Sequence, residues 1–346
     1  MTVQIGTSKA PEGTKGEGWT IRAYREGDIP GIAEVMNAAN AEDGIERLMT
    51  VDDLMMEFAM PISDPPRQVI VAESEAGALV GYGRIIGIDD ESSGERLYQF
   101  NLKVHPGARE QGLDEALVER LMAMARAHNS EPGRAPAEKV SILSIARANQ
   151  TSRQELLEKI GLQNVRYSWV MERPLGDDLP EPGPVEGVSV RNYRHPADNV
   201  AAHKAYNNSF IDHFEFHELP QEFWDFQIGR PEMKYDLSWL AEAEDEPGRF
   251  VGFCICEVKE CDNQLTGRKE GWIGLLGTVR GWRGKGLGRS LLLRGLRSLK
   301  ETGMETALLG VDSESPTGAN RLYESVGFTV RFVEVLYKCE LGEITI

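Results

Sequence analysis

Apolar residues along the chain follow two spacings, which predict helices and strands in a fixed order. In the segment 286–302, leucines recur at helical spacing, and most of the basic residues lie off that apolar stripe. Shorter apolar runs before this segment predict strands, and another strand is expected from Leu308 to Val311. The expected buried helix face consists of Leu287, Leu291, Leu292, Leu296 and Leu299.

The same order of elements is expected twice. Each copy has a strand, one or two helices, three strands, a long helix, and then a strand, a helix and a strand. This order predicts an α/β fold in which a mixed, mostly antiparallel sheet is flanked by helices. The expected ranges are 20–24, 29–40, 51–59, 68–73, 78–86, 98–104 and 112–127, then 189–193, 198–209, 221–228, 237–243, 249–258, 271–279 and 286–302.

Three sequence blocks also recur in the same order, which indicates an internal repeat. The matched residues include Arg22 with Arg191, Arg109 with Arg283 and Gly161 with Gly327, at offsets of 169, 174 and 166 positions. We therefore expect two tandem domains, at residues 19–174 and 188–346. A disordered tail is expected at 1–18, and a proline-containing linker at 175–187.

Composition narrows the classes of partner. The 346 residues include 38 Lys and Arg against 55 Asp and Glu, a net charge of −17. This acidity argues against a nucleic-acid partner, because phosphate backbones require a basic surface. No apolar run of membrane-spanning length and no secretion signal is apparent. We expect a cytoplasmic protein without a membrane partner, as a monomer or homodimer.

The cysteines suggest neither a disulfide framework nor a metal site. Cys254, Cys256 and Cys261 lie close together, but no partners at zinc spacing follow them. Cys254 and Cys256 are expected to be buried, reduced strand thiols.

The sharpest local signal is RGKGLG, from Arg283 to Gly288, between an apolar strand and an amphipathic helix. Glycines allow a backbone to approach a ligand, and a helix start offers free N–H groups to phosphate. A dinucleotide-binding fingerprint fails because Arg289 stands where its third glycine belongs. A Walker loop fails because Gly286 follows Lys285. Taken alone, the motif also fits a surface turn.

Its context resembles the GNAT acetyltransferase superfamily. A strand ending at Thr278–Val279 leads into R-G-x-G-L-G, then a helix, a strand and A-x-x-L-Y-x-x-x-G-F, from Ala319 to Phe328. The resemblance is strong over residues 188–340 and weak over 19–173. It implies a tandem two-domain member of the superfamily that uses acetyl-CoA as co-substrate and no metal.

The resemblance also implies roles for residues. The strand end would pair with the pantetheine arm, the loop would grip the pyrophosphate, and Tyr323 would protonate the departing thiolate. Ser315 stands where many members carry Asn, so Asn320 is expected to contact the cofactor instead. A buried structural tyrosine is the alternative for Tyr323. The implied cofactor-binding residues are Gly277, Thr278, Val279, Arg283, Gly284, Lys285, Gly286, Leu287, Gly288, Arg289, Asn320 and Tyr323.

An amine acceptor must lose a proton, at a cost of about 4.6 kcal/mol at pH 7 for a lysine-like amine. Asp312 follows the strand 308–311 and is the expected catalytic base, with a loop-capping acid as the alternative. Glu270 is excluded, because eight strand residues place it roughly 27 Å from Thr278.

The segment 210–218 is expected to wall the acceptor pocket. His213, Glu215 and His217 are its candidate substrate-binding residues. The two histidines are spaced i, i+4, but no third ligand completes a metal site. An aromatic-lined loop and a proton relay are the other interpretations.

The first copy carries changes that disable the same site. Glu110 and Asp114 replace Gly284 and Gly288, and Leu157 replaces Tyr323, although Asn149 keeps the amide that is absent at Ser315. Each acid would cost about 4 kcal/mol against a phosphate at roughly 4 Å and an effective dielectric constant of about 20. We expect that only the second copy binds acetyl-CoA.

The leading hypothesis is an acetyltransferase that acts on the amine of a small molecule by direct attack in a ternary complex. The alternatives are a non-catalytic acyl-CoA sensor or scaffold, and a protein N-acetyltransferase.

Overall fold

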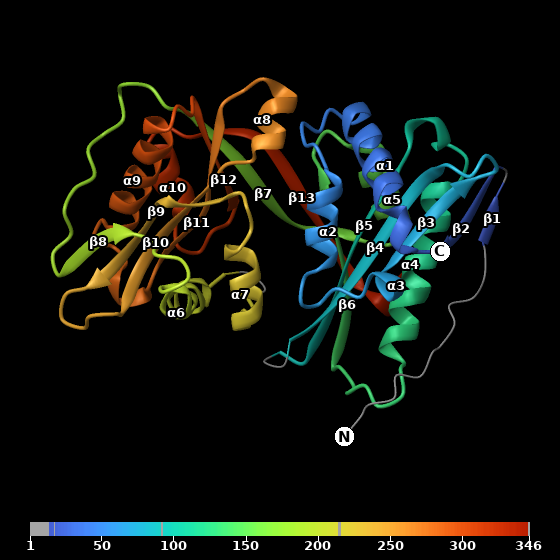
Figure 1. Cartoon of the computed structure of the whole chain (residues 1–346). Coiled ribbons are helices and arrows are strands. Elements are labelled where there is room, and N and C mark those ends of the chain that lie inside the picture. The colour runs from blue at the N-terminus through green and yellow to red at the C-terminus, as the bar shows by residue number, and fades with distance from the viewer. Residues whose placement is uncertain (1–13, 17, 91–92, 214–215, 345–346) are drawn as a thin grey trace. The chain divides into compact units, whose positions relative to one another are not determined.

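The computed structural model describes residues 14–16, 18–90, 93–213 and 216–344. These form two compact units. Unit 1 takes in the described residues up to 144, residues 150–163, and those from 337 onward; unit 2 takes in residues 145–149 and 164–336. In each unit a mostly antiparallel sheet is flanked by helices, which confirms the expected fold class (Figure 1).

The sheet of unit 1 has the strand order β1-β2-β3-β4-β5-β6, with only β5 and β6 parallel. Strand β1 falls within the expected tail, most of which lies outside the described residues. The elements are β1 (Thr14–Gly16), β2 (Trp19–Ala23), α1 (Ile29–Glu42), α2 (Val51–Phe58), α3 (Pro65–Gln68), β3 (Val69–Ser74), β4 (Leu79–Asp90), β5 (Glu95–Val104), α4 (Leu113–Asn129), β6 (Lys139–Arg147) and α5 (Thr151–Lys159).

The sheet of unit 2 has the order β7-β12-β11-β10-β9-β8, with only β11 and β12 parallel. The short helix α8 was not expected from the sequence. The elements are β7 (Gln163–Pro174), β8 (Val188–Asn192), α6 (Asn199–Phe210), α7 (Gln221–Ile228), β9 (Met233–Ala243), β10 (Phe250–Glu257), α8 (Glu260–Thr266), β11 (Glu270–Thr278), α9 (Leu287–Glu301), β12 (Thr306–Asp312), α10 (Ala319–Ser325) and β13 (Thr329–Glu340).

Helices cover both faces of the unit 2 sheet, as the alternation of side chains along β10 requires. Cys254 and Cys256 point into the core under α9, and both are buried free thiols, as expected. Phe253, which precedes Cys254, and Ile255, which lies between the two cysteines, point into the core under α6 and α7.

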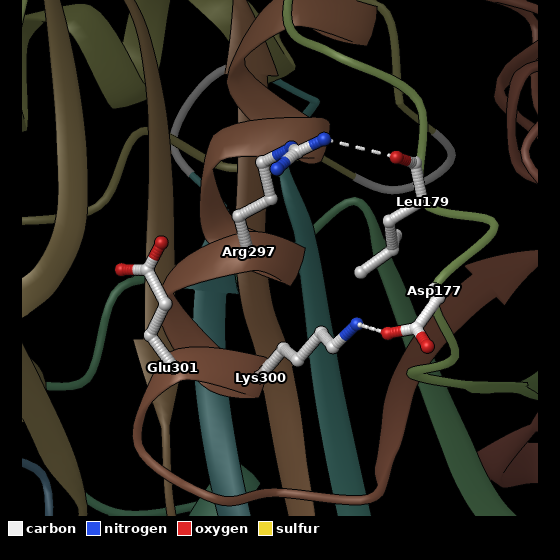
Figure 2. Close-up of a pocket in the computed structure, with 5 residues that line it drawn as sticks. All are labelled: Asp177, Leu179, Arg297, Lys300 and Glu301. Carbon is white, nitrogen blue, oxygen red and sulfur yellow. Dashed lines mark hydrogen bonds and ion pairs between the residues drawn. The ribbon is translucent and has the colours of Figure 1, made fainter.

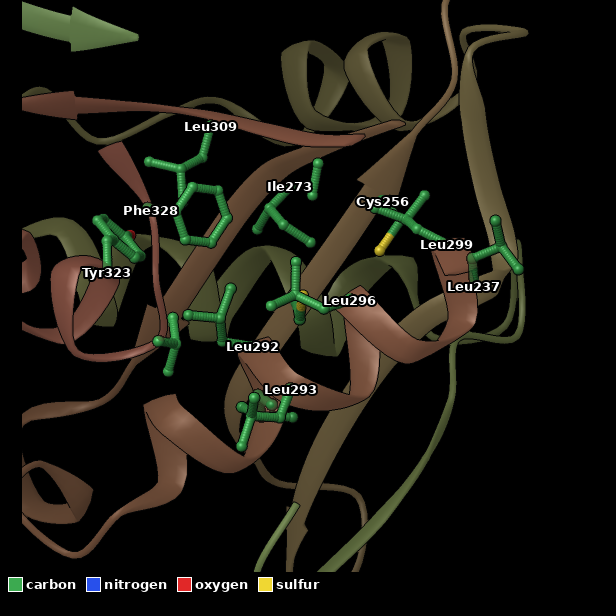
Figure 3. Close-up of a cluster of buried hydrophobic side chains, with 14 of the residues drawn as sticks. Leu237, Cys256, Ile273, Leu292, Leu293, Leu296, Leu299, Leu309, Tyr323 and Phe328 are labelled. Carbon is green, nitrogen blue, oxygen red and sulfur yellow. The ribbon is translucent and has the colours of Figure 1, made fainter. Parts of the chain in front are cut away.

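The five leucines expected on the buried face of α9 are all buried. Figure 3 shows leucines of this helix gathered with Ile273, Leu309 and Phe328. Gly295 allows the helix to approach the sheet closely, because a Cβ there would lie 2.6 Å from Cys254 Sγ. The helix ends near Gly303, whose left-handed φ of 88° suits a C-terminal glycine cap.

Strand β7 comes from the first sequence copy but completes the sheet of unit 2. It pairs with β12 in antiparallel register from Ser168 with Asp312 to Pro174 with Thr306. Strand β13 is divided between the units, because its residues from Tyr337 onward belong to unit 1.

The expected linker runs along α9 and is attached to it by side chains. Ser290 Oγ donates to the Gly183 carbonyl at 2.6 Å. Arg297 and Lys300, farther along α9, also bond to this segment. Over the described residues, no helix is both long and apolar enough to cross a membrane.

The substitution Gly295→Ala tests the close approach of α9 to the sheet. Alanine forms helices better than glycine by about 1 kcal/mol, but here its methyl group would overlap the Cys254 sulfur. We expect the free energy of unfolding to fall by about 1–3 kcal/mol, the usual cost of overpacking, in a urea titration. Combining it with Cys254→Ala should recover part of the loss. A single variant more stable than the parent would contradict the packing.

Candidate functional site

The two parallel strands at the centre of unit 2 part before they end. β11 and β12 pair only from Glu270 to Ile273 on the β11 side. On the other side of β11, the pairing with β10 shifts register, so that Gly274 has no partner in β10. This irregularity is a β-bulge, which bends the strand. Beyond Gly274, β11 keeps β10 on one side and has no described strand on the other.

Backbone groups of β11 face this open edge. The Val279 N–H is already used, since it donates to a carbonyl of β10 at 3.0 Å. Because these groups alternate along a strand, Gly277 also faces β10, whereas the N–H groups of Leu276 and Thr278 face the open edge. Of the three expected strand residues, Thr278 is therefore the one that presents its N–H there.

The loop after β11 contains two glycines with open space beside them. Gly284 and Gly286 have φ values of 74° and 82°, in the left-handed region that favours glycine. A Cβ at either position would meet no atom within 4 Å. The first helical hydrogen bond of α9 is from Ser290 N to Gly286 O, so the N–H groups of residues 287–289 have no acceptor within the helix.

The side chains of this loop lie in different places. Lys285 Nζ is 4.7 Å from the centroid of the Trp282 ring, and Arg289 donates to Ser325 Oγ at 3.1 Å. Leu287 is buried in the core, so only its backbone is available to a ligand. A Cβ at Gly288 would lie 3.5 Å from Thr278 Oγ1, so the helix begins close to the strand end.

Two arginines beside the loop share one carboxylate that the sequence did not single out. Asp212 accepts from Arg283 Nη1 at 2.6 Å and from Arg280 Nε at 2.9 Å. These contacts hold the pKa of Asp212 well below its ordinary value. Arg283 also donates to the Thr278 carbonyl at 3.0 Å, which ties the loop to the open edge of β11.

Tyr323 lies on α10 and is buried, with 7% of its surface exposed. It packs in the core beneath α9, 6.0 Å between ring centroids from Phe328 (Figure 3). Burial raises the pKa of its phenol, and the charge of Cys254 adds to the effect. The phenol is therefore neutral at physiological pH and keeps a proton to donate.

Asn320, one turn earlier on α10, has an acceptor without a partner. Its Nδ2 donates to the Ser313 carbonyl at 2.7 Å. Its Oδ1 is buried and has no hydrogen bond among the described residues. A buried acceptor of this kind suits a ligand N–H group.

Asp312, at the end of β12, is held by an arginine from β7. Arg166 Nη2 lies 2.9 Å from Asp312 Oδ2, and the Glu314 N–H donates to Asp312 Oδ1 at 2.9 Å. These contacts fix the orientation of the carboxylate at the end of β12. The role of base expected for Asp312 stays a prediction.

His213, in the segment expected to wall the acceptor pocket, senses charges from both the loop and the end of β12. Burial and then the charge of Arg283 lower the pKa of His213, while the charges of Asp312 and Asp212 oppose them. His213 also packs on Phe210, with ring centroids 4.5 Å apart. His217 is half-buried, and Glu215 lies outside the described residues.

In unit 1, the corresponding loop keeps its backbone shape. Gly112 caps α4 with a φ of 70°, and Glu110 takes the place of Gly284 with a φ of 62°. A non-glycine residue in this region costs about 1–2 kcal/mol. Burial also raises the pKa of Asp114. The left-handed backbone angles of the loop are thus kept in unit 1, although Glu110 and Asp114 replace two glycines.

The parting of β5 and β6 in unit 1 is filled by the unit's own side chains. The parallel pairing stops at Gln99 with Leu143. Just beyond it, Ser144 Oγ donates to the Phe100 carbonyl at 3.0 Å and accepts from Arg153 Nη2 at 2.8 Å. Burial lowers the pKa of Arg153 to about 10.

A pocket elsewhere in unit 2 contains none of the expected site residues. It encloses about 280 Å³ between the linker segment and the C-terminal half of α9 (Figure 2). Arg297 and Lys300 line it, and both bond to the linker segment. Among the described residues, no group of three His, Cys, Asp or Glu side chains is arranged to hold a metal ion.

Both sequence copies match one known protein family. A model of the acetyltransferase (GNAT) family matches residues 32–140 and 199–328. Mycothiol acetyltransferase from Salinispora tropica is 30% identical over 317 residues, which cover 90% of this chain and 94% of that protein.

Solved structures show the same fold. A GCN5-related N-acetyltransferase from Sphaerobacter thermophilus is 26% identical with a TM-score of 0.69, covering 93% of this chain and 96% of that one. A tandem GNAT protein from the clavulanic acid biosynthesis pathway has a TM-score of 0.68 at 18% identity, covering 94% and 98%. With both sequence copies matched by the family model, the chain belongs to the GNAT acetyltransferase family.

Proposed function

We propose that unit 2 transfers an acetyl group from acetyl-CoA to the primary amine of a small molecule. The observation that carries this proposal is the loop of amides at residues 284–289, beside an unpaired strand edge. Relatives named mycothiol acetyltransferase support a small-molecule acceptor. Thiol release from acetyl-CoA across a panel of amines, with mycothiol precursors included, tests the proposal.

The cofactor would use three features of unit 2. Its pyrophosphate would accept from the first amides of α9, where the helix also carries about half a positive charge. Its pantetheine arm would pair with the open edge of β11 as an added strand. The unpartnered Asn320 Oδ1 would accept a pantetheine N–H.

Transfer would proceed by direct attack. The amine nitrogen bonds to the carbonyl carbon, the C–S bond breaks, and the thiolate takes a proton from Tyr323. An N–H on the open edge of β11 would stabilise charge on the carbonyl oxygen. His213 would take the amine proton, since its lowered pKa keeps it neutral at physiological pH.

The substitution Tyr323→Phe separates an enzyme from a sensor. Removing only the hydroxyl leaves the packing intact, so acetyl-CoA binding by calorimetry should stay near the parent value. The kcat should fall by about 100-fold or more, as for loss of a general acid. Tyr193→Phe, another buried tyrosine of unit 2, is the control expected to keep kcat. Full turnover by Tyr323→Phe would contradict the role of proton donor.

Titration calorimetry should give one acetyl-CoA per chain. Gly284→Glu copies the residue of unit 1 and should weaken binding by about 100-fold, through charge repulsion with phosphate. Gly284→Gln imposes the same backbone strain without the charge, so it should weaken binding less. Two cofactor molecules per chain would refute the inactivity of unit 1.

The pH profile identifies the base. Asp312 raises the pKa of His213, because its negative charge favours the imidazolium. Asp312→Asn should therefore lower that pKa and move the acid limb of kcat/KM to lower pH. His213→Gln should abolish the limb along with most of the activity. If the acid limb instead persists in the residual activity of His213→Gln and is lost in Asp312→Asn, Asp312 is the base.

A further inference from the structure

We propose that Arg166, which belongs to the first sequence copy, is a positioning residue for the reaction in unit 2. Its strand β7 pairs with β12, so the first copy supplies a side chain to the second copy's site. Arg166 would hold the end of β12 and the loop that leads into α10, the helix of Tyr323. This inference rests on the proposed function.

Arg166 contacts two consecutive parts of that loop. Its Nε lies 3.0 Å from both oxygens of Asp312, and its Nη2 lies 2.9 Å from Oδ2. Nη2 also donates to the Glu314 carbonyl at 3.2 Å. The Glu314 side chain is 71% exposed, so its own ion pair with Arg166 contributes little. A planar guanidinium with this set of contacts fixes the direction in which the chain leaves β12.

The loop passes this constraint on to α10. The Ser313 N–H donates to the Tyr167 carbonyl of β7 at 3.0 Å. The Ser313 carbonyl in turn accepts from Asn320 Nδ2, on the first turn of α10, at 2.7 Å. A continuous set of hydrogen bonds therefore connects β7 to the helix that carries Tyr323.

The two sequence copies can be compared to see which ion pairs occur in both units and which occur in one. The Asp212–Arg283 pair has a counterpart in unit 1, where Arg109 Nη1 lies 2.8 Å from Asp43 Oδ1. That pair persists although the unit 1 loop carries acids, so it does not depend on the glycines of the unit 2 loop. At the 166-residue offset of the last block, Arg166 and Asp312 correspond to Phe332 and Ala146. The Arg166–Asp312 pair therefore occurs only with the intact phosphate loop.

The test compares Arg166→Ala and Arg166→Lys with the parent enzyme. Arg331→Ala is the matched control, because Arg331 is equally exposed and pairs with two carboxylates, Glu172 and Glu270, elsewhere in unit 2. Steady-state kinetics supply kcat and KM, calorimetry supplies acetyl-CoA affinity, and hydrogen exchange reports on residues 312–323.

We expect Arg166→Ala to lower kcat by about 10- to 100-fold, the scale of a small misplacement of catalytic groups. Acetyl-CoA affinity should change less than about threefold, Arg166→Lys should recover part of kcat, and exchange should rise at 312–323. Arg331→Ala should match the parent in kcat and in exchange at 312–323. An unchanged kcat, or a loss confined to KM, would overturn the inference.

The proposed function and the inference fail in distinguishable ways. A parent protein that releases no thiol with any amine refutes the proposed function. Hydrogen exchange at 312–323 then tests the role of Arg166 separately. Faster exchange in Arg166→Ala supports the proposal that Arg166 holds the loop, and unchanged exchange refutes it. If Arg166→Ala does not fold, Arg166→Lys takes its place in both measurements.

Discussion

The site in unit 2 depends on one constraint, the early end of the pairing between two parallel strands. Backbone N–H and C=O groups need partners, and a strand that loses a neighbour keeps a row of them free. The bulge at Gly274 turns β11 away from β12, which leaves those groups facing an open edge. The glycine loop and the start of α9 follow directly along the chain, so the open strand edge and the free amides of the helix start lie in consecutive segments.

The duplication supplies an internal comparison that one sequence seldom offers. The ion pairs of Asp43 with Arg109 and of Asp212 with Arg283 occur at matching positions of the two units. Glu110 holds a glycine-like conformation in a loop whose acids disfavour phosphate. Ser144 and Arg153 bridge the point where β5 and β6 part. The loop of unit 1 thus keeps left-handed backbone angles while its side chains differ from those of unit 2.

Local patterns predicted much of this arrangement. Helical spacing located the buried face of α9, and the glycines of RGKGLG marked a loop whose backbone is open to a ligand. Pairings between distant residues escaped prediction, because neither the Asp212 contacts nor the Arg166–Asp312 pair has a signal in spacing. The pairing of β7 with β12 could not be predicted either, because an alternating apolar pattern indicates a strand but not the strand with which it pairs.

Strand β7 belongs to the first sequence copy but pairs with β12 of the second, which limits how far the chain can be shortened. A protein cut back to the second sequence copy would leave β12 with a bare hydrogen-bonding edge, the kind of surface that invites aggregation. A shortened chain would therefore have to retain β7 together with the second copy, because β7 is the strand that covers this edge of β12.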